Sequence, residues 1–189
     1  MDTRIKAVIF NEEEHKYWYD SKELHGVTGA IGKLMGKSFP DTDVVKLATI
    51  YGSDVHKEVE NYYNSDSKIL SSDGAKWVVE YLEQFKLKHF VNKIECEVMV
   101  SDFEGTASKI DVVVRTDVGA YIFDIKTTSH FDRAYCSLQL SVYKKLYEQC
   151  YEDNVIGMFV LGTKSKRAFR ILEQEKTKVD KILSMNKGE

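Results

Sequence analysis

Three charged residues interrupt a stretch of the chain whose pattern is otherwise that of a plain β-hairpin. Asp124 and Lys126 are two positions apart, so they share one face of the second strand. A four-residue loop over 116–119 sets Asp111 of the first strand directly opposite Asp124. Opposed carboxylates repel unless a cation lies between them, so the hairpin indicates a site for a hard cation such as Mg²⁺ or Mn²⁺. The alternative is an ordinary hairpin whose aspartates face solvent, with Lys126 as an ion-pair partner.

A second candidate ligand lies on a predicted helix that begins at Asp43 and ends near Asn64. Gly52, His56 and Glu60 are spaced at i, i+4 and i+8, which places them on one stripe of this helix. An imidazole is a ligand that favours Mn²⁺ over Mg²⁺, and a glutamate one turn away could orient it. The alternative is an exposed histidine with an acidic neighbour.

A polar pair lies on a further predicted helix over about 134–151. Its apolar stripe begins at Leu138 and repeats every four residues, which predicts the buried face. Gln139 and Tyr143 lie on the adjacent stripe, about 100° round, so we expect them at the margin of the sheet and not fully beneath it. An ordinary amphipathic margin would look the same.

The remaining segments predict a scaffold of alternating strands and helices. Expected are a hairpin within 7–20, helices over 27–36 and 73–90, strands over 93–101, 105–111, 155–161 and 168–172, and a charged helix or frayed end from 173. This order predicts a mixed α/β fold with a central mixed sheet flanked by helices.

The length of 189 residues and the 43% apolar composition predict one domain over 1–189. We divide it into an N-terminal hairpin and helices over about 1–92, a core over about 93–172 and a charged tail over 173–189. The single proline, Pro40, and the absence of low-complexity runs offer no linker. No long apolar run or signal-peptide pattern is present, so we expect a cytoplasmic protein that does not bind membranes.

The formal net charge of −3 conceals a basic segment near the C-terminus. Lys164, Lys166, Arg167 and Arg170 lie on or beside a predicted loop and could bind the phosphates of DNA, although a solvated loop explains them equally well. The three cysteines are widely spaced, which argues against a disulfide framework and predicts buried small hydrophobic residues.

Taken in chain order, these motifs resemble the RecB-like branch of the PD-(D/E)XK nuclease superfamily. The matching residues are Gly52, His56 and Glu60 on a helix, Asp111 on a strand, Asp124-Ile125-Lys126 on the next strand, and Gln139 with Tyr143 on the following helix. Two departures stand out: Ser108 occupies a position where the branch often has glycine, and Ile110 replaces the proline before the first aspartate.

The resemblance implies a restriction-endonuclease-like core and a divalent-metal-dependent deoxyribonuclease, most similar to phage or mitochondrial genome-maintenance exonucleases that act on DNA ends or single strands. Asp111, Asp124 and Lys126 would be catalytic, with Gln139 and Tyr143 helping to fix Lys126 and the DNA. The expected Mg²⁺ or Mn²⁺ ligands are His56, Asp111, Asp124 and the carbonyl of Ile125, with Glu60 behind His56. We expect no iron–sulfur cluster, because the cysteines are not clustered. A structure-specific endonuclease and an inactive nucleic-acid-binding module of the same fold remain alternatives.

Overall fold

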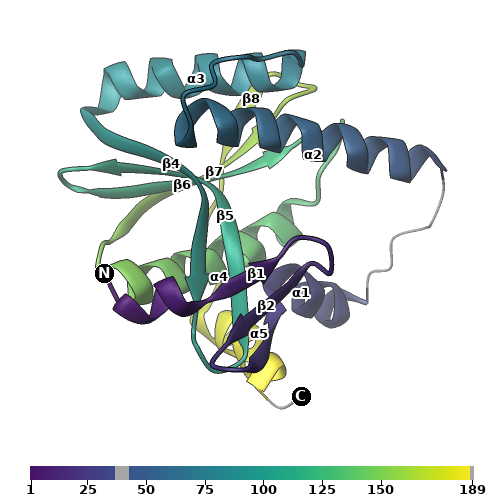
Figure 1. The fold of residues 1–189 in the computed structure, drawn as a ribbon, viewed down its shortest axis with the longest axis vertical. Coiled ribbons are helices and arrows are strands. Elements are labelled where there is room, and N and C mark those ends of the chain that lie inside the picture. The colour runs from purple at the N-terminus through teal and green to yellow at the C-terminus, as the bar shows by residue number, and fades with distance from the viewer. Residues whose placement is uncertain (37–42, 188–189) are drawn as a thin grey trace.

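A central mixed β-sheet with helices on both faces organises the chain, as the computed structural model of residues 1–36 and 43–187 shows (Figure 1). The predicted fold class is therefore confirmed, and the arrangement is consistent with a restriction-endonuclease-like fold. After a 3₁₀ turn at Thr3–Ala7, the elements are β1 (Ile9–Asn11), β2 (Lys16–Tyr19), β3 (Lys22–Gly26), α1 (Val27–Met35), α2 (Asp43–Asn64), α3 (Asp73–His89), β4 (Val91–Ser101), β5 (Thr106–Thr116), β6 (Gly119–Lys126), α4 (Arg133–Tyr151), β7 (Val155–Gly162), β8 (Arg167–Arg170) and α5 (Lys176–Lys187).

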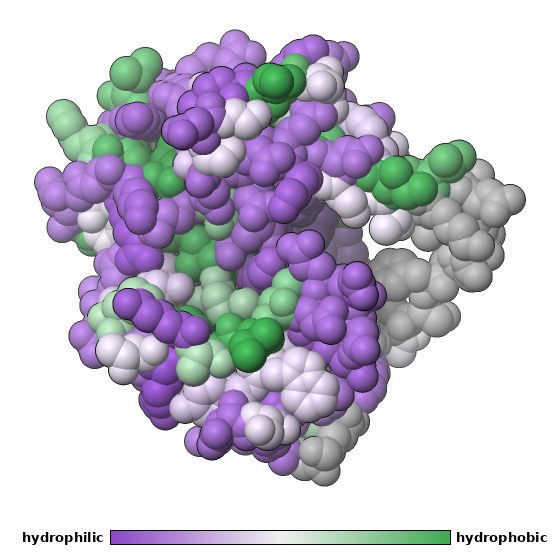
Figure 2. Space-filling model, viewed as in Figure 1, coloured by the Kyte–Doolittle hydropathy of each residue, from purple (hydrophilic) through white to green (hydrophobic). Residues whose placement is uncertain are grey.

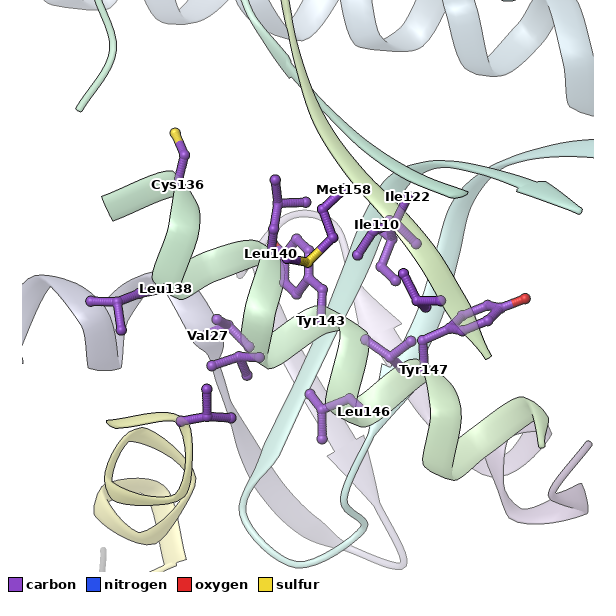
Figure 3. Packing of buried hydrophobic residues seen from close by; sticks show 14 of the residues in the cluster. Val27, Ile110, Ile122, Cys136, Leu138, Leu140, Tyr143, Leu146, Tyr147 and Met158 are labelled. Atoms are coloured by element: carbon purple, nitrogen blue, oxygen red, sulfur yellow. The ribbon is translucent and has the colours of Figure 1, made fainter. Parts of the chain in front are cut away.

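Two apolar layers hold the helices against the sheet. On one face, α2 and α3 pack over β4 to β7, with Val55, Leu82 and Phe123 among the buried residues. On the other face, α1, α4 and α5 enclose the second layer (Figure 3). Both faces of the central strands are thus covered, as expected where a helix crosses between parallel strands such as β6 and β7.

The central strand β5 has a fork along one edge. β4 pairs with β5 along almost its whole length, so it occupies one edge. The other edge is divided: β3 runs parallel to β5 at 106–107, and β6 runs antiparallel to it at 112–116. The ends of β3 and β6 diverge between these two ladders, beside residues 108–111 of β5. The fork thus opens the sheet beside Asp111, one of the candidate site residues.

The β5–β6 hairpin has the predicted register. Arg115 pairs with Ala120, and the same register sets Asp111 opposite Asp124, one step beyond the last ladder pair. The loop is shorter than predicted, because its outer two residues join the ladder and leave only 117–118 as the turn.

Helix α4 is buried on two sides, which corrects one prediction. Leu140 and Tyr143 point toward the sheet, whereas Leu138 and Leu146 point away from it, on the side that α1 and α5 cover (Figure 3). Gln139 and Tyr143, predicted at the margin of the sheet and not fully beneath it, are only 4% and 3% exposed, so they are more deeply buried than we expected. The helix is enclosed by both the sheet and two further helices. The sequence analysis assumed only one buried face, along the apolar stripe.

The C-terminal tail forms a docked helix and not a frayed end. Val179, Ile182 and Leu183 of α5 are buried in the layer with α1 and α4. Near the end of the helix, the backbone carbonyl of Asn186 comes so close to Gly105 that a Cβ there would lie 2.5 Å from its oxygen. Glycine therefore permits the contact between α5 and the start of β5.

The N-terminal region contains one strand more than predicted, because β3 follows β2 after a tight turn and then leads directly into α1. The predicted helix over 27–36 is confirmed and ends at Gly36, which has a left-handed φ of 61°. Helix α3 is capped by Ser72, whose hydroxyl accepts a hydrogen bond from the Ala75 N–H, and not by Asp73. Pro40 lies outside the described residues.

The three cysteines are buried, as predicted; Cys96, Cys136 and Cys150 are free thiols at 5%, 1% and 0% exposure. None of the helices in 1–36 and 43–187 is long and apolar enough to cross a membrane.

Candidate metal centre

The fork between β3 and β6 opens into a cavity of about 1250 Å³. Its walls come from the N-terminal strands, α1, α2, β5, β6 and α4, and the surface is hollowed between α2 and the N-terminal strands (Figure 2). The cavity brings together the candidate residues from four separate elements: His56, Glu60, Asp111, Asp124, Ile125, Lys126, Gln139 and Tyr143. The basic loop residues are not part of this wall.

His56 reaches the floor of the cavity because α2 comes close to the end of β6. A Cβ at Gly52, one turn earlier, would lie 3.1 Å from the Thr127 hydroxyl, so the glycine permits this approach. His56 Nε2 lies 3.2 Å from the Ile125 carbonyl oxygen, a contact that requires an N–H donor. In the neutral imidazole with that tautomer, Nδ1 carries the lone pair, and it lies 3.6 Å from Asp111 Oδ2. The imidazole is thereby oriented with a ligand atom toward the carboxylate.

Asp111 is fixed from the neighbouring strand. Its Oδ2 accepts a hydrogen bond from the Ile125 N–H at 2.7 Å. The Ile125 carbonyl, which we predicted as a metal ligand, accepts the hydrogen bond from His56 and still has a second lone pair. The Asp-x-Lys strand therefore positions both the histidine and the first aspartate through its backbone.

A third carboxylate, which the sequence interpretation did not select, joins His56 and Asp111. Glu97 of β4 offers an oxygen that lies, with a His56 nitrogen and an Asp111 oxygen, in a group of ligand atoms all within 4.8 Å of one another. We call these three residues the metal cluster. A nitrogen and carboxylate oxygens at such spacing fit a divalent cation such as Mn²⁺.

The backbone of Glu97 explains how its side chain reaches the cavity. Its φ of 53° is left-handed, a conformation that costs a non-glycine residue about 1 kcal/mol. Cys96 packs in the layer with α2 and α3, but Val98 packs in the layer with α4, although alternate residues of a regular strand share a face. The pleat therefore reverses at Glu97, and on β5 the same reversal occurs between Ile110 and Val112. No motif in the sequence marks such a reversal.

The buried Asp124 and the half-buried Lys126 form an ion pair next to the cluster. Lys126 Nζ donates to Asp124 Oδ1 at 3.0 Å and lies 2.9 Å from Oδ2. Asp124 Oδ2 is buried and accepts no hydrogen bond from any residue that the structure describes, so it has capacity for a further partner. Burial acts to lower the pKa of Lys126, but the carboxylates of Asp124 and Asp111 outweigh it and raise the pKa. Lys126 thus remains an ammonium ion.

Polar side chains of α4 and β5 hold this lysine from behind. Lys126 Nζ lies 3.4 Å from Gln139 Oε1, to which it donates, and Gln139 Nε2 donates to the Tyr143 hydroxyl at 3.0 Å. Ser108 also donates to that hydroxyl, at 3.2 Å. Burial raises the pKa of Tyr143, which therefore stays protonated. Ser108 thus takes part in the network.

Glu60 and the basic loop have contacts that differ from those we expected. Glu60 lines the cavity, but its Oε2 accepts from Lys57 at 2.9 Å, whereas the described contacts of His56 are with Asp111 and Ile125. Its role behind His56 remains a prediction.

Two members of the basic loop contact aromatic rings outside the cavity wall. Lys164 Nζ lies 4.7 Å from the centre of the Tyr51 ring, and Arg167 lies over Phe169. The lysines that do line the cavity are Lys33, Lys57, Lys109 and Lys126. Binding of DNA by the basic loop also remains a prediction.

Glu97 should make the metal-free protein less stable as the pH rises. Burial and the neighbouring Asp111 raise its pKa from 4.5 to about 7, so the folded state holds a proton that the unfolded chain has lost between these values. The free energy of unfolding is expected to fall across that window, by up to about 3 kcal/mol. Urea denaturation in EDTA from pH 4.5 to 7.5 measures this loss, and Glu97→Gln should flatten it. Parallel curves for the two proteins would contradict the assignment.

The chain is similar to solved structures and has no match among family models or curated sequences. Among solved structures, the chain is similar to a protein from Eubacterium rectale named "Putative exonuclease", with 15% identity, a TM-score of 0.46, and coverage of 87% of this chain and 77% of that one.

Proposed function

We propose that the protein is a divalent-metal-dependent deoxyribonuclease that hydrolyses phosphodiester bonds. The observation that carries the proposal is the metal cluster of His56, Glu97 and Asp111 with Lys126 in the same cavity. Hydrolysis of a phosphodiester needs an activated water and positive charge where the transition state becomes more negative. Ligand atoms and a fixed ammonium in one place meet both needs.

The donor set favours a hard cation. His56 Nδ1, Glu97 and Asp111 would hold Mg²⁺ or Mn²⁺, and Asp124 is the nearest further carboxylate, with an oxygen that accepts no hydrogen bond from the described residues. A bound cation of this kind supplies Lewis-acid polarisation of a phosphoryl oxygen and lowers the pKa of a bound water. The imidazole tilts the preference toward Mn²⁺.

Lys126 supplies the positive charge that the protein itself contributes. Its raised pKa excludes it as a general base at neutral pH, so its role is electrostatic: it orients the attacking water and stabilises the phosphorane oxygens. Gln139 and Tyr143 keep the ammonium aimed into the cavity through two successive hydrogen bonds. They are positioning residues.

The substrate we propose is DNA, attacked as an exonuclease attacks ends or single strands in replication, recombination or repair. Support comes from the lysines along the cavity wall, which suit a polyanionic backbone, and from the order of motifs that the chain shares with RecB-like nucleases. We propose an intracellular, cytoplasmic setting in a bacterium or phage.

A digestion series tests the proposal. Linear single-stranded and duplex DNA labelled at the 5′ or 3′ end is incubated with the protein in Mn²⁺, in Mg²⁺ and in EDTA. Cleavage with either metal and none in EDTA is expected. Circular single-stranded DNA should survive if the enzyme needs an end, and its cleavage would indicate an endonuclease. DNA binding without cleavage under any metal condition would contradict the nuclease and leave a binding module.

A further inference from the structure

An aromatic group from the N-terminal hairpin forms part of the cavity wall. Phe10 of β1 lies with its ring centre 4.6 Å from that of Tyr17 on β2, and the ring of His15 stands edge-on to Phe10 at 5.2 Å. All three line the cavity. Tyr17 is buried, Phe10 half-buried and His15 exposed, so the aromatic surface runs from the core to the cavity mouth.

Packing of the hairpin does not account for His15. Its side chain is exposed, and its φ of 54° is left-handed, where glycine or asparagine would serve a plain turn. Within the described hairpin, Tyr17 supplies the buried contact that packing requires. The exposed ring is therefore available for a ligand that enters the cavity.

A lysine connects this aromatic group to the metal cluster. Lys109 Nζ lies 4.2 Å from the centre of the Phe10 ring and 3.7 Å from Glu97 Oε2. Lys109 is also two positions before Asp111 on β5, so the aromatic group and the cluster are separated by one side chain. A group bound at the rings would thus lie next to a group bound at the cluster.

Rings and lysines lining one cavity recognise two parts of a nucleotide. Aromatic faces stack on bases, and lysines attract the phosphates between them. In a duplex the bases stack on one another, so a base can reach Phe10 or His15 only when it is unpaired. We propose that the cavity takes a single-stranded nucleic-acid end, with one unpaired base against Phe10 and His15 and the adjoining phosphate near the metal cluster. The placement of that phosphate rests on the proposed nuclease function, whereas the stacking does not.

Binding measurements without cleavage test the stacking. Fluorescence anisotropy with labelled oligonucleotides is carried out in Ca²⁺, which takes the same oxygen ligands as Mg²⁺, and the oligonucleotides are checked for integrity afterwards. The test protein is the Phe10→Leu, His15→Ala double variant, and His15→Ala alone serves as the milder change. The matched control is Phe90→Leu, His130→Ala, which alters an exposed phenylalanine and an exposed histidine outside the cavity wall. Thermal melting checks that each variant is folded.

The double variant should bind a single strand about tenfold more weakly than the unmodified protein, because one stacked base contributes about 1 to 3 kcal/mol. The control variant should bind as the unmodified protein does. A single strand with abasic sites and a blunt duplex should bind weakly, with no further loss in the double variant.

Three results would overturn the inference. The double variant could bind the single strand as tightly as the control variant does, or its loss of affinity could be as large on abasic DNA as on the intact strand. The unmodified protein could also fail to bind the single strand. Cleavage is measured separately, so the two proposals fail in different ways. Normal nuclease activity with no effect of Phe10 or His15 removes only the stacking. Base-dependent binding without any cleavage removes only the nuclease.

Discussion

Lys126→Ala should bind DNA and lose cleavage, with a rate at least 10² to 10³ times lower than that of the unmodified protein. The ammonium lies 2.9 Å from Asp124 and is held by Gln139 behind it, so the substitution removes a positive charge whose position these two contacts fix. Binding should persist, because other lysines line the cavity and the charge of Lys126 acts mainly on the transition state.

The same substitution leaves a buried carboxylate without its partner. Asp124 is 2% exposed, and breaking a buried ion pair from one side costs about 3 to 5 kcal/mol. Lys126→Gln is therefore made in parallel, because its amide can still donate to Asp124 without carrying a charge. Urea denaturation separates loss of fold from loss of chemistry.

Single-turnover rates on labelled DNA in Mg²⁺ and in Mn²⁺ give the measurement. The matched control is Lys88→Ala, an exposed lysine on α3 outside the cavity wall, which should cleave normally. Normal rates from a folded Lys126→Gln would remove this lysine from the proposed mechanism.

The hairpin shows what the sequence could establish about the site. Strand alternation and a turn of the right length place Asp111 opposite Asp124, and a local register of this kind depends only on residues near one another in the chain. The helical stripe likewise predicts that His56 follows Gly52 by one turn. It does not predict that Gly52 lies against Thr127, because that contact joins segments far apart in sequence.

Glu97 is a residue of the candidate site that the sequence alone does not identify. The sequence does not mark this residue as part of the site, because strand alternation gives no sign of a reversal in the pleat. The left-handed φ of 53° and the contact with Lys109 accompany the reversal of the pleat that β4 and β5 share. Such a cost in backbone energy persists where surrounding structure imposes it, and it often marks a functional position. The burial of Gln139 was missed for a related reason, since it depends on a contact with Lys126 on a strand of the sheet.

Asp111→Asn should abolish detectable cleavage and weaken Mn²⁺ binding on the order of 100-fold. Asp111 belongs to the metal cluster and also accepts the Ile125 N–H at 2.7 Å. The asparagine oxygen can still accept that hydrogen bond, so the fold should survive while the anionic ligand is lost. Asp124→Asn should also weaken Mn²⁺ binding, because it removes charge from the oxygen that has no hydrogen-bond donor among the described residues.

Isothermal titration with Mn²⁺ measures both effects, and Asp117→Asn is the control from the same hairpin. Asp117 lies in the β5–β6 turn, where it accepts from Asn92 at 2.8 Å and does not line the cavity. Unchanged Mn²⁺ affinity in Asp111→Asn would rule out this carboxylate as a ligand. If only Asp111→Asn lowers the Mn²⁺ affinity, Asp124 serves as the ion-pair partner of Lys126 and is not a metal ligand. The protein ligands would then be the three residues of the metal cluster. A loss in both would extend the site across the two strands, as the facing carboxylates of the hairpin predict.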